Sequence, residues 1–111
     1  MLTLPKPSPA DVRVFQGQPL LFGVVDRIAR RFVHVNDTFE ALTGFKKQEL
    51  RNCPHSLDKL LKDEDSVREL VQSTGIAFRQ VWRDRDGKVM NVYCAVIQKG
   101  RYVYLEALQL D

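Results

Sequence analysis

The spacing of apolar positions changes along the chain, and the change separates a helical part from a final set of strands. After two apolar segments, apolar residues recur every three or four positions as far as residue 75, which is typical of helices. From residue 76 onward they alternate with polar residues, as in half-buried strands. The pattern predicts a hairpin of strands over 19–25 and 30–35, short helices at 37–43, 46–50 and 56–61, a longer helix over 62–75, and strands over 76–83, 88–98 and 101–110.

The first predicted helix has a recognisable start and end within the stretch HVNDTFEALTGF, residues 34–45. Asn36 or Asp37 suits the N-cap position, and Asp37 followed by Glu40 is a variant of the capping box. Gly44 suits the left-handed position at which many helices end. Signals at both ends therefore define a helix of about two turns.

The two periods together predict one buried core. Turns at Asp86-Gly87 and Lys99-Gly100 join the last three strands into an antiparallel sheet. Short helices cannot bury a core alone, so we expect them to cover one face of this sheet. The residues expected in the core are Phe39, Leu42, Phe45, Val92, Cys94, Val103 and Leu105.

The opposite face of the sheet is also rich in apolar residues, including Val89, Tyr93, Ile97, Tyr102, Tyr104 and Leu108. A face of this kind needs a cover. Ser8-Pro9 predicts the start of a short helix that ends at Gly17 within an N-terminal extension, residues 1–18. This helix can cover the face within one chain or between two chains, and we expect a homodimer. The contact is expected to include Val12, Phe15, Tyr93, Tyr102, Tyr104 and Leu108.

The composition is that of one globular domain. The chain has 111 residues, of which 44% are hydrophobic and 28% charged, and the domain itself is expected over residues 19–111. The net charge is +3, and the basic residues are scattered along the chain with acidic residues between them, so we expect no nucleic-acid partner. The sequence has no apolar segment long enough to cross a membrane, so no membrane partner is expected either. The first residues lack the apolar run of a signal peptide, so we expect the two cysteines to be reduced thiols in the cytoplasm. Cys53 and Cys94 form no C-x-x-C motif, so no metal site is expected.

Three stretches together resemble the PAS (Per-Arnt-Sim) sensor family: RRFVHVNDTFEALTGFKKQEL, DRDGKVMNVYCAVI and YVYLEAL. Their order and spacing match the family's strand, short helix, aromatic after Thr-Gly, Asp-Gly hairpin and last two strands. The resemblance implies an α+β fold, in which a five-stranded antiparallel sheet carries short helices on one face. It also implies a small apolar cavity for a ligand and a signal passed to an effector domain, such as a kinase or cyclase, beyond Asp111.

The side chains expected around such a ligand are Phe39, Phe45, Phe78, Gln80, Trp82 and Cys94. Most of these residue types are more often plain core packing than pocket lining, but Gln80 is polar among Ile76, Phe78 and Trp82. A buried amide needs hydrogen-bond partners, which a ligand or water could supply. We therefore expect any ligand to be small, largely apolar and oriented by Gln80.

The identity of a cofactor is left open by the sequence. Cys53 lies in LRNCPHSL, which superficially resembles the flavin-adduct motif of light-sensing (LOV) PAS domains, but it arrives about two residues too early and lacks the Arg-Phe-Leu-Gln that follows. His34 and His55 are the only candidate haem ligands, and neither lies on the longest helix, where haem-binding relatives place theirs. Flavin and haem are thus unsupported by any motif, and an interior without a cofactor is a third alternative.

We expect this domain to sense or transmit a signal and to have no enzymatic activity of its own. The sequence has no Ser-His-Asp order, no paired carboxylates and no phosphate loop. One alternative is a ligand-free dimerisation module with a fully packed interior. Another is a small enzyme on an unrelated α+β fold, which would need a perturbed acid or base in an open cleft.

Overall fold

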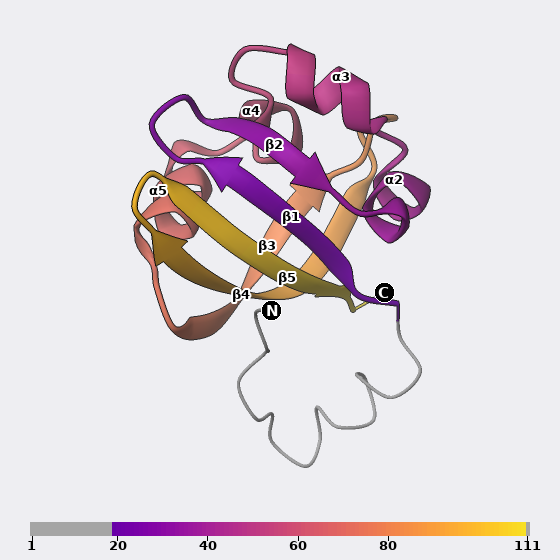
Figure 1. Cartoon of the computed structure of the whole chain (residues 1–111). Helices are drawn as coiled ribbons and strands as arrows, with labels where there is room; N and C mark the ends of the chain where they lie inside the picture. Colours follow the sequence, from indigo (N-terminus) through magenta and orange to yellow (C-terminus); the bar gives the residue numbers. More distant parts are fainter. Residues whose placement is uncertain (1–18, 111) are drawn as a thin grey trace.

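The computed structural model describes residues 19–110. A sheet of five strands and four short helices make up this part of the chain, with the helices along one side of the sheet (Figure 1). The predicted helix from Ser8 to Gly17 lies outside the described residues. The elements in chain order are β1 (Leu21–Asp26), β2 (Arg31–Val35), α2 (Asp37–Thr43), α3 (Lys47–Asn52), α4 (Leu57–Leu60), α5 (Glu64–Gln72), β3 (Ile76–Arg83), β4 (Val89–Lys99) and β5 (Tyr102–Gln109).

The sheet is antiparallel throughout, with strand order β2-β1-β5-β4-β3. The last strand, β5, pairs with both β1 and β4, so the hairpin that begins the domain joins the three strands that end it. This arrangement leaves β2 and β3 as the two edges. The α+β fold expected from the sequence, a five-stranded antiparallel sheet with short helices on one face, is confirmed.

Helix α2 starts and ends close to where the sequence predicts. Asn36 is the N-cap: its side-chain oxygen accepts from the Phe39 N–H at 2.9 Å and also from the Phe22 N–H of β1 at 3.1 Å. Gly44 follows the helix with a φ of 80°, which a residue with a side chain rarely adopts. The predicted capping box is wrong, because the Glu40 carboxylate instead accepts from the Lys47 N–H, at 2.6 Å.

Helix α5 is shorter than the 62–75 range that the apolar spacing predicts. It starts at Glu64 because Asp63 caps it, and it ends at Gln72, after which Ser73 has an extended backbone. The segment that remains between the helix and β3 turns at Gly75, with a φ of 73°, and the Gly75 N–H donates to the Val96 carbonyl. The chain therefore leaves the helix early and enters the sheet as an edge strand.

The core lies between the helices and the inner face of the sheet, as expected. Phe39, Phe45, Val92, Cys94, Val103 and Leu105 are buried there. Gly23 pairs with Leu105 on this face, where a Cβ atom would come within 3.3 Å of the Phe32 ring. One expectation needs correction, because Leu42 is only partly buried at the margin of the core. Ile76, at the end of the edge strand β3, is 51% exposed. No helix among residues 19–110 is long and apolar enough to cross a membrane.

Candidate functional site

The middle of the core is filled by three aromatic rings from three elements. Phe32 of β2 packs edge-on against Phe39 of α2 with ring centroids 5.2 Å apart, and Phe39 packs against Trp82 of β3 at 5.8 Å. All three side chains are fully buried. Aromatic contacts at these distances are stabilising, so the rings tie α2 to both edges of the sheet.

Gln80 of β3 is the polar residue that the structure places against this ring cluster. Its side-chain oxygen accepts a hydrogen bond from the Trp82 indole N–H at 3.0 Å. Its side-chain nitrogen donates to the Ser66 carbonyl of α5 at 2.8 Å and lies 3.4 Å from a carboxylate oxygen of Glu69. The partners that the sequence leaves to a ligand or water are therefore supplied by the protein. We refer to Ser66, Glu69, Gln80 and Trp82 as the α5–β3 seam.

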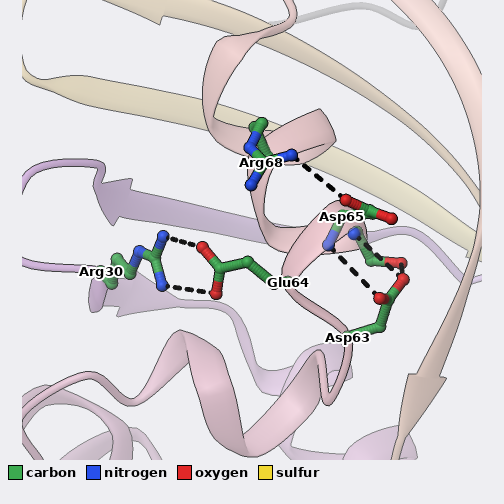
Figure 2. Close-up of polar contacts among 6 residues, drawn as sticks. Arg30, Asp63, Glu64, Asp65 and Arg68 are labelled. Atoms are coloured by element: carbon green, nitrogen blue, oxygen red, sulfur yellow. Dashed lines mark hydrogen bonds and ion pairs between the residues drawn. The ribbon is translucent and has the colours of Figure 1, made fainter.

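The start of α5 is held in place by charged groups (Figure 2). The Asp63 carboxylate accepts from the Ser66 hydroxyl at 2.8 Å and from the Asp65 and Ser66 N–H groups at 3.3 and 3.2 Å, and these bonds keep the pKa of Asp63 below its usual value. Arg30, in the turn between β1 and β2, forms a two-bond ion pair with Glu64. Hydrogen bonds from Arg30 lower the pKa of Glu64, so this pair stays charged near neutral pH.

The far end of α5 is also bonded to the sheet. The Gln98 side chain of β4 donates to the carbonyl of Val71 at 2.7 Å and to that of Ser73 at 3.3 Å. Together with Gln80, this amide gives the helix two polar attachments to neighbouring strands. A displacement of α5 along the sheet would therefore have to break hydrogen bonds to both β3 and β4.

A pocket of about 560 Å³, open to solvent, lies at the β3 edge of the sheet, beside the seam. Asp63 and Ser66, at the start of α5, line it. Gln80 and Val81 of β3 and Leu110, after β5, line it as well. Its volume is in the usual range of small-molecule sites. We call it the edge pocket, and Gln80 is the residue that it shares with the α5–β3 seam.

The charge of the edge pocket is predominantly positive. Lys62, Arg79 and Arg83 line it, against the single carboxylate of Asp63. Arg79 and Lys62 are exposed, and Arg83 is half-buried with a hydrogen bond to the Gly87 carbonyl at 3.3 Å. Within residues 19–110, no ion pair involves any of these three cations.

The other residues expected around a ligand lie in the core and away from the edge pocket. Phe39, Trp82 and Cys94 are fully buried, Phe45 is 5% exposed and Phe78 is partly buried. Burial raises the pKa of the Cys94 thiol, and the charge of Glu69 raises it further, so this thiol stays protonated. Of the six residues predicted for the site, Gln80 alone lines the edge pocket. That the five core residues contact a ligand stays a prediction.

The candidate cofactor residues are not brought together. Cys53 is partly exposed, and its thiol donates to the Pro54 carbonyl at 3.4 Å. His34 is exposed on β2, where its ring is tilted against that of Phe22 with centroids 5.9 Å apart. His55 is exposed in the α3–α4 connection with a φ of 56°. No group of three or more potential metal ligands occurs in the described range.

The residues expected in a dimer contact lie on the outer face of the sheet where the structure describes them. Tyr102 is 39% exposed, Tyr93 and Tyr104 are half-buried, and Leu108 is only 2% exposed, which leaves it almost no surface for a partner. Val12 and Phe15 are outside the described residues. Two outer-face residues not in the predicted contact, Val81 of β3 and Val89 of β4, are about half exposed, at 50% and 49%.

The cations of the edge pocket are the functional candidates that the sequence reasoning missed. Alternation along β3 places Arg79, Val81 and Arg83 on one face, and this pattern is visible in the sequence. Lys62 joins them only through the packing of α5 against β3, because it lies 17 positions before Arg79 in the chain. The partners of Gln80 were missed for the same reason, because Ser66 and Glu69 belong to a different element.

Comparison of the sequence with known proteins finds no match: no family model fits the chain, and no curated protein sequence is similar to it. The structure, in contrast, is similar to many solved ones. A domain of a sensory box sensor histidine kinase/response regulator from Geobacter sulfurreducens superimposes with a TM-score of 0.62 at 14% identity, over 89% of this chain and 90% of that one.

Two further structures give the same result. The PAS domain of an HTR-like protein from Haloarcula marismortui matches with a TM-score of 0.56 at 19% identity, over 90% of this chain and 89% of that one. A LOV protein from Rhodobacter sphaeroides matches with a TM-score of 0.62 at 15% identity, over 88% of this chain and 63% of that one. At such identities the likeness shows the fold, and the PAS-like fold expected from the sequence is confirmed.

Proposed function

We propose that this PAS-like domain is a sensory signalling module, in which a small ligand acts on the α5–β3 seam and the change passes to an effector. The observation that carries the proposal is the double role of Gln80. It lines the open edge pocket, and its amide bonds join the buried Trp82 to the backbone of α5. A ligand that competes for this amide would weaken the link between helix and sheet.

The solved structures with this fold support a signalling role. One is a domain of a sensor histidine kinase/response regulator, and we propose an effector of the kinase class for this chain as well. The domain itself is proposed to have no enzymatic activity. In support, the carboxylate that lines the edge pocket, Asp63, is used as a helix cap and has a lowered pKa, which makes it a poor general base. The free cysteines support the cytoplasm as the compartment.

The proposal is tested by screening small molecules for an increase in melting temperature. A ligand that binds the folded state stabilises it by an amount that grows with its concentration. We expect active compounds to stabilise the parent and the matched variant Gln72→Leu, whose amide is exposed on α5, but to stabilise Gln80→Leu much less. Equal stabilisation of Gln80→Leu by every compound that stabilises the parent would refute the role of the seam.

A second candidate function, a ligand-free dimerisation module, is favoured by a specific observation. The rings of Phe32, Phe39 and Trp82 fill the core, while Val81, Val89 and Tyr102 stay exposed on the outer face. Under this proposal the outer face associates with a second copy of the chain, in the homodimer expected from the sequence. Sedimentation at micromolar concentration would show a dimer for the parent and a monomer for Tyr104→Asp. A parent that sediments as a monomer at every concentration would exclude this function.

A further inference from the structure

The charges around the edge pocket indicate the chemical class of its ligand. We infer that the edge pocket binds a small organic anion, such as a carboxylate with a short apolar chain, in contact with Lys62, Arg79 and Arg83. The inference rests on the proposed function, because it names the kind of molecule that would act on Gln80. It places the ligand at the edge of the sheet, outside the packed ring cluster.

The first step is that none of these three cations is paired with a carboxylate of the described residues. Four other arginines, namely Arg30, Arg68, Arg85 and Arg101, each form an ion pair with a carboxylate of the chain. Lys62, Arg79 and Arg83 form none within the described part of the chain, although they line one pocket. An anion that enters the pocket can therefore bind these cationic donors without displacing a protein carboxylate.

The second step is the spacing of the cations. Arg79 and Arg83 lie on the same face of β3, four residues apart, which corresponds to roughly 13 Å along an extended strand. Val81 lies between them on the strand, and all three residues line the edge pocket. Lys62, which precedes α5, lines the same pocket. Guanidinium groups hold a carboxylate through paired N–H donors, and the ammonium adds a third point of attraction.

The third step is the single acidic group of the pocket, which does not cancel this charge. The oxygens of Asp63 are occupied by the Ser66 hydroxyl and by two backbone N–H groups of α5. One carboxylate against three cations leaves a positive excess at the pocket. Outside the lining, Glu69 contacts the Gln80 nitrogen and adds a negative charge near the inner end. The anionic group of the ligand is therefore expected toward Arg79 and Arg83 and away from Glu69.

The fourth step concerns the rest of the ligand. Val81 and Leu110 give the pocket an apolar wall, and Gln80 provides an amide at its inner side. An inorganic ion would leave this wall uncovered, whereas a short alkyl chain would bury it and gain free energy for each methylene group. The matched pair of hexanoate and its neutral amide, hexanamide, separates the contribution of charge from that of apolar contact.

The test uses the full chain and measures binding of hexanoate and hexanamide by calorimetry at constant ionic strength. In parallel, the emission of Trp82, the only tryptophan, reports on the seam through its hydrogen bond to Gln80. We expect saturable binding of hexanoate with a change in Trp82 emission, and at least tenfold weaker binding of hexanamide. Arg79→Gln/Arg83→Gln should weaken hexanoate binding at least tenfold. The control Lys46→Gln/Arg51→Gln removes the same charge from exposed positions at α3 and should bind like the parent.

The outcomes separate this inference from the proposed function. No binding of hexanoate, or equal weakening by the β3 and α3 double variants, would overturn the anion site. Equal binding of hexanamide and hexanoate with a change in Trp82 emission would also overturn it, while the sensory role of the seam would stand. Binding of hexanoate that depends on Arg79 and Arg83 but leaves Trp82 emission unchanged would support the anion site and contradict the coupling in the proposed function.

Discussion

The two faces of the sheet differ in how much of their apolar surface is buried within the chain. On the inner face, apolar side chains are buried against the helices, and the buried amide of Gln80 has partners on both its oxygen and its nitrogen. On the outer face, Val81, Val89 and Tyr102 each keep at least 39% of their surface exposed. The side chains of the inner face are buried within the described part of one chain, whereas the outer face keeps exposed apolar surface, which we propose a partner covers. Substitutions should therefore affect mainly stability on the inner face and mainly association on the outer face.

The sharpest test of the inner face is Phe39→Ala, which has the largest expected effect. Removal of this ring leaves a cavity between Phe32 and Trp82, so the free energy of unfolding should fall by about 3–5 kcal/mol. Urea unfolding of the parent and the variant measures the difference. The control on the outer face is Val89→Ala, which should change the value by less than about 1 kcal/mol because Val89 is half exposed. Similar losses from both variants would mean that the two faces do not differ.

A second test replaces the one buried amide of the inner face at the seam. Gln80→Leu keeps most of the volume but leaves the Trp82 indole N–H and the Ser66 carbonyl without their partner. A buried polar group that lacks its hydrogen bond costs about 1–3 kcal/mol. Urea unfolding should therefore show a decrease in the free energy of unfolding in that range, together with altered Trp82 emission. Gln72→Leu makes the same change at an exposed position of α5 and should leave both readings close to those of the parent. A Gln80→Leu protein as stable as Gln72→Leu would show that the bonds of the seam add nothing.

How much of the fold the sequence could predict depends on how far apart along the chain the interacting residues lie. The strands were predictable because alternation and two glycine turns are local signals, and so was α2, whose cap residue and Gly44 lie within ten positions of each other. The capping box failed because Glu40 found a donor, the N–H of Lys47, in the next helix. Local spacing could not indicate that competition.

The candidate site was predictable only in part for the same physical reason. Polarity within an apolar face identified Gln80, but its partners lie 11 to 14 positions away along the chain, apart from Trp82. The side chains of Lys62 and Arg79 meet at one pocket only after α5 has packed beside β3. Aromatic residues on apolar faces, in contrast, indicate burial without telling a packed core from a ligand cavity.

A third test uses pH on the outer face, where one carboxylate is an exception to the comparison. Asp26 at the end of β1 is largely buried; burial alone would raise its pKa, but bonds from the Ala29 and Ile28 N–H groups and from Arg101, at 2.8 Å, lower it overall. Because the folded state favours the charged form, its stabilising effect is complete above the unfolded pKa of about 3.9 and is lost as pH falls through the lower folded value.

Asp26→Asn should therefore be less stable than the parent at pH 7, and the gap should narrow as pH falls below about 4. Thermal or urea unfolding between pH 7 and pH 2.5 measures this gap. The matched control is Asp86→Asn in the turn before β4, where the side chain is exposed and forms no ion pair in the described part of the chain. A gap that stays constant over the whole pH range would mean that the charge of Asp26 makes no contribution.

The smallest effect on stability and the most informative one on association is expected from Tyr102→Ser. Tyr102 is exposed enough that its loss should lower the free energy of unfolding by less than about 1 kcal/mol. Tyrosine is enriched among the interface residues whose truncation costs more than about 1 kcal/mol, so we expect the dimer dissociation constant to rise at least about fivefold. The control is Ile28→Ser, which removes an apolar side chain that is 67% exposed in the turn between β1 and β2. Sedimentation over a concentration series measures the dimer dissociation constant of both variants. Equal values would show that the position of an exposed apolar residue makes no difference, and the outer face would then not be a dedicated interface.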